Sequence, residues 1–566
     1  MVSRHVNSIS ARLSLRTPQR RSLEILDRVM EITQPHKGGD LKAALEIIRS
    51  EFPTVEDFEH AFPSLCFALA TGVGKTRLMG AFITYLHLEH GIRHFFVLAP
   101  NLTIYNKLLA DFTPNTPKYV FQGIAEFGVK APTLVTGENF EQKPQVLDLF
   151  ERDDVVINIF NISKFNEKAK AADEEGKKTL KVRRLSEFLG RSYFDYLAGL
   201  DDLVLIMDEA HRYRADTSTK SIEDLKPVLG LELTATPQIE AGNKSSRFEN
   251  VIYSYPLARA MQDGFVKEPA VATRANFNPK SMSKDALDLL KLEDGVRVHE
   301  SVKVDLDVYA RQNGVRKVKP FMLIIAENTD HASELVKLIE GESFFDGRYK
   351  GRVIQVHSGQ KGAEKDENVE RLLSVERPDE PTEIVVHVNM LKEGWDVTNL
   401  YTIVPLRTAD SRTLVEQSIG RGLRLPYGKR TGVAAVDRLT IVAHDRFQEI
   451  IDDAGRADSP IRLQAVVIDP VQFAQRTVTV ISQSRLDTMM GVRPVGAGGT
   501  TVVAGEDAPR AFARLDEQAV AQVAMDEIRR YQSQPDVVPS VTHLALPEVQ
   551  AAIVKAVDAR MAPPQL

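Results

Sequence analysis

A glycine-rich turn at residues 69–76, LATGVGKT, has the residue types that bind phosphate. It follows an apolar stretch expected to be a strand and precedes one expected to be a helix, which is the context of a phosphate loop. Its backbone N–H groups and the positive end of the helix dipole would face a phosphate. Position 69 is Leu, whereas the common pattern begins with glycine. The predicted nucleotide-binding residues are Thr71, Gly72, Val73, Gly74, Lys75 and Thr76, and Thr76 is also a predicted Mg²⁺ ligand.

A pair of acidic residues ends the apolar stretch LVLIM, in the sequence Asp208-Glu209-Ala210-His211. Parallel sheets present catalytic side chains at the carboxyl ends of their strands. Asp208 is suited to hold Mg²⁺, and Glu209 is suited to orient and deprotonate a water molecule that attacks the terminal phosphate. Without the phosphate loop upstream, two incidental acids in a polar turn would be an equally good interpretation.

Two further patterns would complete a hydrolytic site. Thr234 and Thr236 flank an alanine after the stretch LEL, so their hydroxyls can link the nucleotide to a second ligand. On a helix, Gln417, Arg421 and Arg424 share one face because their spacing is i, i+4 and i+7. Two guanidinium groups on that face can hold a transferring phosphoryl group, although taken alone such a face is more often solvated.

Short apolar runs alternate with amphipathic stretches in two successive series, which predicts two parallel sheets covered by helices, an α/β fold. The first series contains the phosphate loop and the acids, and the second contains the arginines. A nucleotide between the two units would be contacted from both sides. The predicted organisation is a helical segment 1–50, a first α/β domain 51–270, a linker 271–318, a second α/β domain 319–460 and a C-terminal accessory region 461–566.

The composition is that of an ordinary globular protein, with 43% hydrophobic and 27% charged residues. No apolar run is long enough to span a membrane. A single cysteine, Cys66, excludes an internal disulfide and a cysteine-based zinc site, and it fits a cytoplasmic location. The net charge of −6 gives no support for nucleic-acid binding, so the argument for function rests on local sites.

The motifs together resemble those of a superfamily-two helicase of the DEAH-box type with two tandem RecA-like domains. They are most similar to the restriction (Res) subunit of type III restriction enzymes and to related prokaryotic defence helicases. The resemblance covers about residues 15–450 and is carried by DEAHRYRAD, by EQSIGRGLRLP and by NMLKEGWDVTNLYTIVPLR, residues 389–407.

The resemblance implies roles for further residues. It implies that Gln19 reads adenine and that His211 couples ATP to nucleic acid together with the two threonines. It also implies that Gly394 and Asp396 contact the nucleotide or the nucleic-acid strand across the cleft between the two domains. Lys75, Glu209, Arg421 and Arg424 would be the catalytic residues, with Gln417 completing the nucleotide site. The expected nucleic-acid contacts are Pro100, Asn101 and Asn328.

The expected function is an ATP- and Mg²⁺-dependent helicase or translocase on double-stranded DNA, in a restriction or antiviral defence system. The resemblance implies a partner nuclease or methyltransferase subunit. We expect no association with a membrane. Two alternatives stay open at this point: an RNA helicase, and an ATP-gated scaffold without motor activity. The family's nuclease motif is not supported, because no Asp/Glu-x-Lys follows Pro535-Asp536 or Pro378-Asp379.

Overall fold

Two sheets, each of seven parallel strands, form the framework of this computed structural model and confirm the predicted α/β class. Contacts divide the chain into two units, residues 1–470 and 471–566, and both sheets lie in the first unit. The described residues are 3–140, 154–162, 185–186, 191–213, 216–241, 244–274, 277–278, 282–356, 368, 371–372, 374–388, 397–406, 422–444, 464–468, 514–532, 537–538 and 541–561.

The first sheet has the order β11-β1-β8-β7-β2-β4-β3, so that one strand, β8, lies between the strand before the phosphate loop (β1) and the strand that ends at the acidic pair (β7). Its strands are β1 (Ser64–Leu69), β2 (His94–Ala99), β3 (Thr133–Thr136), β4 (Val156–Asn161), β7 (Leu203–Asp208), β8 (Leu229–Thr234) and β11 (Val251–Tyr255). Its helices are α1 (Arg4–Arg12), α2 (Thr17–Thr33), α3 (Leu41–Glu51), α4 (Lys75–His90), α5 (Leu102–Phe112), α6 (Ala125–Val129), α9 (Tyr193–Gly199), α10 (Asp216–Glu223) and α11 (Leu257–Gln262).

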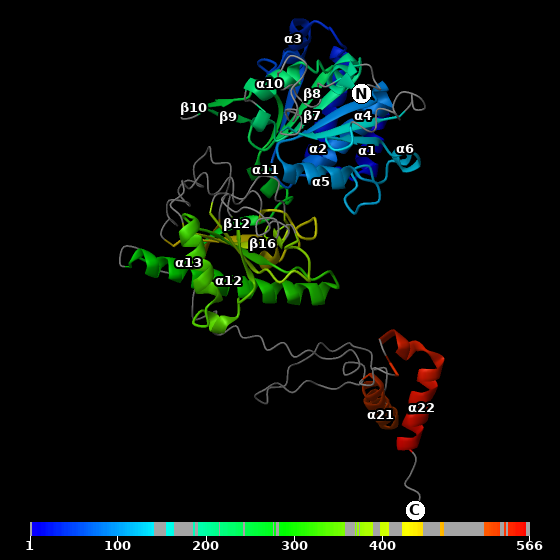
Figure 1. The fold of residues 1–566 in the computed structure, drawn as a ribbon, viewed down its shortest axis with the longest axis vertical. Helices are drawn as coiled ribbons and strands as arrows, with labels where there is room; N and C mark the ends of the chain where they lie inside the picture. Colours follow the sequence, from blue (N-terminus) through cyan, green and yellow to red (C-terminus); the bar gives the residue numbers. More distant parts are fainter. Residues whose placement is uncertain are drawn as a thin grey trace, which may run out of the picture. The chain divides into compact units, whose positions relative to one another are not determined.

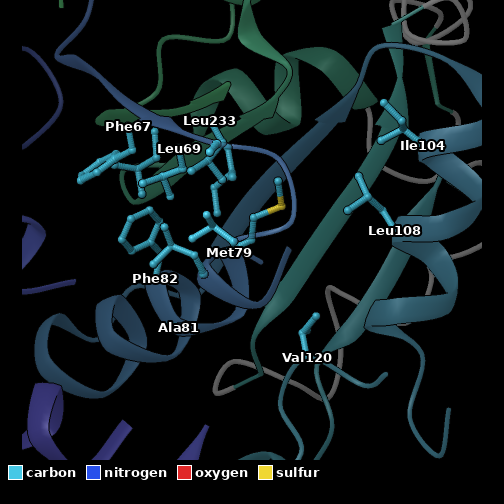
Figure 2. Packing of buried hydrophobic residues seen from close by; sticks show 14 of the residues in the cluster. Phe67, Leu69, Met79, Ala81, Phe82, Ile104, Leu108, Val120 and Leu233 are labelled. Atoms are coloured by element: carbon cyan, nitrogen blue, oxygen red, sulfur yellow. The ribbon is translucent and has the colours of Figure 1, made fainter. Parts of the chain in front are cut away.

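Both faces of this sheet are buried. Along β1, Phe67 and Leu69 pack against α4, as Figure 2 shows, whereas Cys66 lies in the core on the other face. This alternation explains why the sequence LCFAL is apolar throughout, as strands covered on both sides are. Helix α4 is itself buried from Leu78 to Leu86, because α1 and α2 pack on it (Figure 1).

The second sheet has the order β14-β15-β13-β16-β17-β12-β18, again with parallel pairing throughout. Its strands are β12 (Glu268–Arg274), β13 (Phe321–Ile325), β14 (Val353–Val356), β15 (Ile384–His387), β16 (Leu400–Pro405), β17 (Arg438–Val442) and β18 (Gln464–Ile468). Its helices include α12 (Lys284–Asn313), α13 (Thr329–Glu340) and the short α17 (Ala434–Asp437).

The predicted linker at 271–318 differs from the structure. Most of β12 and all of α12 fall in this segment, and α12 packs against strands β13, β16 and β17 of the second sheet (Figure 1). The sequence of α12 suggested a linker because several of the side chains that it buries are charged. Asp294 is fully buried, where Arg274 Nε donates to it at 2.6 Å and His444 Nε2 lies 3.0 Å away. These partners come from strands or strand ends, which a linear sequence pattern does not show.

The C-terminal region also begins later than predicted, because β18 belongs to the second sheet. In the second unit, the described helices are α21 (Leu515–Gln532) and α22 (Pro547–Met561). They pack on one another, and the buried Glu527 pairs with Arg560 at 3.0 Å. None of the described helices is both long and apolar enough to cross a membrane.

Candidate nucleotide site

The phosphate loop joins β1 to α4, as the sequence predicts. Gly72 and Gly74 have φ angles of +80° and +102°, a backbone conformation that glycine adopts without the steric cost of a side chain. Helix α4 begins at Lys75, and no side chain caps its first turn. Its N–H groups therefore remain available to a phosphate, and the donor set fits the triphosphate of a nucleotide.

The two acids lie next to this loop. Strand β7 ends at Asp208, and Lys75 Nζ is 3.1 Å from Oε1 of Glu209. Glu209 has a φ of +50°, an unusual value for a residue that is not glycine and one that is often found at functional sites. The structure thus brings together the lysine and the carboxylate that were assigned separately from the sequence.

Asp208 is a carboxylate in an unfavourable environment. Burial, and next the charge of Glu209, raise its pKa to about 6, against the opposing influence of Lys75 and Lys107. Its side chain is only slightly exposed, so little water is available to stabilise its charge. A divalent cation would supply that stabilisation. With the hydroxyl of Thr76, Asp208 therefore fits the oxygen ligands that Mg²⁺ prefers.

A chain of contacts leads from the acids to the Thr-Ala-Thr element. His211 Nδ1 is 3.7 Å from Glu209 Oε2 and 3.0 Å from Thr234 Oγ1. The Thr234 hydroxyl is buried, donates to the carbonyl of Thr236 and accepts from its backbone N–H. The three residues predicted to couple ATP to a second ligand therefore form a chain of contacts, and His211 is the member next to the acid.

The N-terminal segment contacts the phosphate loop. Gln19 is buried, its Nε2 donates to the carbonyl of Gly74 at 2.8 Å, and its Oε1 accepts from the backbone of Arg16. Arg16 donates to the carbonyl of Gly72 at 2.7 Å. Both ends of the Gln19 amide are thus engaged within the chain, and its predicted role in reading adenine stays a prediction.

Arg424, which lies between β16 and β17 in the chain, is near the phosphate loop. A Cβ built at Gly72 would lie 3.7 Å from Cγ of Arg424. The charge of Arg424 also lowers the pKa of Arg16, although burial is the larger cause. Four other predicted site residues, Gly394, Asp396, Gln417 and Arg421, lie outside the described residues.

The predicted nucleic-acid contacts lie at the starts of two helices. Asn101 caps α5 by accepting from the N–H of Ile104, and Asn328 caps α13 by accepting from the N–H of His331. Pro100 is half-buried beside the first cap. Capping is a sufficient structural reason for both asparagines, so their contact with nucleic acid stays a prediction.

A possible alternative metal site in the second sheet is better explained as an ion-pair cluster. His299, Glu300 and Glu383 offer ligand atoms within 4.8 Å of one another. However, Lys303 Nζ lies 2.7 Å from Glu383 and 3.1 Å from Glu300, and Tyr349 donates to Glu300. The lysine ammonium already supplies the positive charge that a metal would bring.

Comparison with known proteins finds a family match over the phosphate loop and the two acids. Residues 14–239 match the family described as type III restriction enzyme, res subunit. Over this part the chain is similar to type III Res subunits. It is 23% identical over 440 residues to the probable HindVIP Res subunit of Haemophilus influenzae, covering 63% of this chain and 79% of that protein.

Other relatives match shorter stretches. The putative ATP-dependent helicase IRC3 of Saccharomyces cerevisiae is 24% identical over 240 residues, which are 40% of this chain and 32% of IRC3. The EcoPI Res subunit of Escherichia phage P1 is 32% identical over 146 residues, which are 22% of this chain and 14% of that subunit. A putative HsdR fragment from Vibrio vulnificus gives a TM-score of 0.45 at 17% identity, over 83% of this chain and 72% of that one. The chain thus spans only part of several relatives.

Three residues near the site were not predicted from the sequence. Lys107 on α5 favours the ionised form of Asp208 through its charge. Arg16 binds the phosphate loop, and Arg430 holds the segment that joins the two sheets. For Arg16, the sequence offered one indication, its position three residues before Gln19. Lys107 and Arg430 gave no such indication, because their partners are distant in sequence.

Proposed function

We propose that the chain is an ATP-hydrolysing motor that moves along or unwinds double-stranded DNA. The observation that carries this proposal is the 3.1 Å approach of Lys75 to Glu209, beside the buried carboxylate of Asp208. A phosphate-binding lysine, a metal-binding acid and a water-activating acid in one place are the parts that nucleoside triphosphate hydrolysis requires.

Each residue of the site has a distinct role in this proposal. Lys75 would exchange Glu209 for the nucleotide phosphates, and this exchange would free the carboxylate to orient and deprotonate the attacking water. Thr76 and Asp208 would hold Mg²⁺, which neutralises phosphate charge when bound. Arg424, from the segment between β16 and β17, would face the phosphates from the other side of the loop. The contacts through His211 and Thr234 would couple nucleotide binding and hydrolysis to the binding of a nucleic-acid strand.

The resemblance to restriction-modification Res subunits supports double-stranded DNA as the substrate and a restriction or defence role, with a nuclease or methyltransferase as partner. An RNA helicase would use the same hydrolytic residues, since none of them reads bases. An ATP-gated scaffold would not need Glu209 beside the phosphate loop, so the geometry favours a hydrolytic enzyme.

The test is ATP hydrolysis measured without polynucleotide and then with single-stranded DNA, double-stranded DNA or RNA. We expect double-stranded DNA to give the largest stimulation. Glu209→Gln should retain ATP binding and lose at least about 100-fold in turnover, since it removes the base. Glu46→Gln, the same change at an exposed glutamate of α3, is the matched control and should behave as the wild type.

Each other outcome has a defined meaning. Stimulation by RNA alone would replace the DNA motor with the RNA helicase. ATP binding without hydrolysis under all conditions would refute the motor and favour the scaffold. Turnover retained by Glu209→Gln would show that the acid pair has been assigned to the wrong chemistry.

A further inference from the structure

The chain passes from the first sheet to the second through one short segment. Among the described strands, those of the first sheet end by Tyr255, and those of the second begin at Glu268. Between them lie α11 and then residues 263–267. Together, α11 and residues 263–267 are here called the crossing segment. Any change in the relation of the two sheets must alter backbone angles here or at the ends of the adjoining elements.

Arg430 holds this segment with all three nitrogens of its guanidinium group. Nη2 donates to the carbonyl of Met261 at 2.7 Å, Nε donates to that of Val266 at 3.1 Å, and Nη1 pairs with Glu268 at 2.6 Å. These acceptors lie before, within and after the turn at Gly264, whose φ is +73°. One planar group therefore fixes the shape of the whole turn, which the single ammonium of a lysine does not match.

The segment is also tied to the region that contains Arg424. The backbone N–H of Lys267 donates to the carbonyl of Leu423 at 2.6 Å. Its side chain is buried, and Nζ donates to the carbonyls of Thr398 and Leu400 at 2.7 and 2.8 Å. Displacement of the crossing segment would therefore displace the backbone next to Arg424.

On its other side the segment contacts the phosphate loop. Val266 is buried, and its Cγ1 would lie 2.9 Å from a Cβ built at Gly72. Arg16 lies over the ring of Phe265 at 5.1 Å and binds the carbonyls of Gly72 and Gly428. The crossing segment thus lies between the loop that binds phosphate and the residues that flank Arg424.

We propose that Arg430 is a positioning residue for ATP hydrolysis, acting by clamping the crossing segment so that Arg424 stays aligned with the phosphate loop. The inference rests on the proposed hydrolytic function for its kinetic consequence, but not for the clamp itself. The loop that carries Arg430 is itself held in place, because Asp437 accepts from the N–H groups of Thr431 and Gly432.

The test combines kinetics with hydrogen exchange on the full chain. In Arg430→Ala, we expect the DNA-stimulated kcat to fall about 10- to 100-fold, as small misplacements of catalytic groups do, with the KM for ATP within about threefold. Arg430→Lys keeps a charge opposite Glu268 but loses two acceptors, so its kcat should be intermediate. Arg311→Ala, an exposed arginine on α12, is the matched control.

Hydrogen exchange measures the clamp without hydrolysis. In the wild type, the non-hydrolysable analogue AMP-PNP with Mg²⁺ should change exchange in peptides covering 261–268 and 423–430. In Arg430→Ala both peptides should exchange faster and no longer respond, while the affinity for AMP-PNP stays within about threefold. If the wild type hydrolyses no ATP, the motor proposal fails, and the clamp is judged by exchange alone.

Two results would overturn the inference. One is unchanged exchange in both peptides of Arg430→Ala. The other is a kcat that changes in proportion to thermal stability in the two Arg430 variants. In that case Arg430→Lys would have full turnover if its unfolding temperature equalled that of the wild type. The second result would mean that Arg430 contributes only to folding.

Discussion

The buried carboxylate of Asp208 should destabilise the protein that has no bound nucleotide. Its pKa is raised from 3.8 to about 6, mainly by burial and next by the charge of Glu209. A raised carboxyl pKa means that the folded state holds the proton more tightly than the unfolded state. The contribution to stability is therefore full below the ordinary pKa and is lost as pH rises through the folded value. Asp208→Asn, which cannot ionise, should stabilise the protein at neutral pH.

The size of the effect follows from the shift. A difference of about two pKa units corresponds to about 3 kcal/mol at pH 7.5, where both states of the wild type are ionised. At pH 5 the folded carboxyl is mostly protonated, and the advantage of the asparagine should fall to roughly half of that value.

The assay is urea unfolding of the wild type and Asp208→Asn at both pH values, in a buffer without Mg²⁺ or nucleotide. Asp201→Asn makes the same change at an exposed aspartate and should alter the free energy of unfolding by less than about 0.5 kcal/mol. A gap between wild type and Asp208→Asn that is absent, or equal at the two pH values, would refute the argument. Asp208→Asn should also lose the Mg²⁺-dependent part of its affinity for ATP.

Three further changes test other contacts. Gly74→Ala should weaken ATP binding at least about tenfold in a fluorescent-nucleotide titration, because φ is +102° and the new Cβ would meet Gln19 Nε2 at 2.6 Å. Thr234→Val should keep basal hydrolysis within about threefold but lose stimulation by nucleic acid, because it breaks the contact with His211. Asn101→Ala should cost about 1 kcal/mol in urea unfolding, with basal hydrolysis unchanged, because it removes the cap of α5. Full stimulation in Thr234→Val, or an unchanged unfolding midpoint in Asn101→Ala, would contradict these assignments.

The placement of the phosphate loop beside the acid pair was predictable because the signals of both are local. The phosphate loop and the acid pair each combine a strand end with specific residue types within a few positions, and the fold places them together as expected. Arg430 has no such signal. Its acceptors, the carbonyls of Met261 and Val266 and the carboxylate of Glu268, lie more than a hundred residues away, and two of them are backbone atoms that any residue type provides.

The domain boundary was missed for a related reason. Helix α12 lacks a clear apolar stripe because its buried face includes Lys291, Asp294 and His299. Burial of such groups is favourable only with partners such as Arg274 or His444, which the folded chain provides. Period and composition therefore indicated a linker with some helix, whereas the stability of the segment depends on ion pairs between residues distant in sequence.

The position of β12 has a consequence for synthesis of the protein on the ribosome. Its two neighbours in the sheet are β17 and β18, so residues 275–437 must be made before the first of them exists. The first sheet, in contrast, has its strands complete once Tyr255 has emerged. Synthesis proceeds at about 5–20 residues per second, so β12 has no partner strand for roughly ten to thirty seconds after it is made. During that time the first sheet already has all of its strands. We therefore expect nascent or shortened chains that end between these points to need chaperones, and to aggregate more readily than chains that end before Glu268.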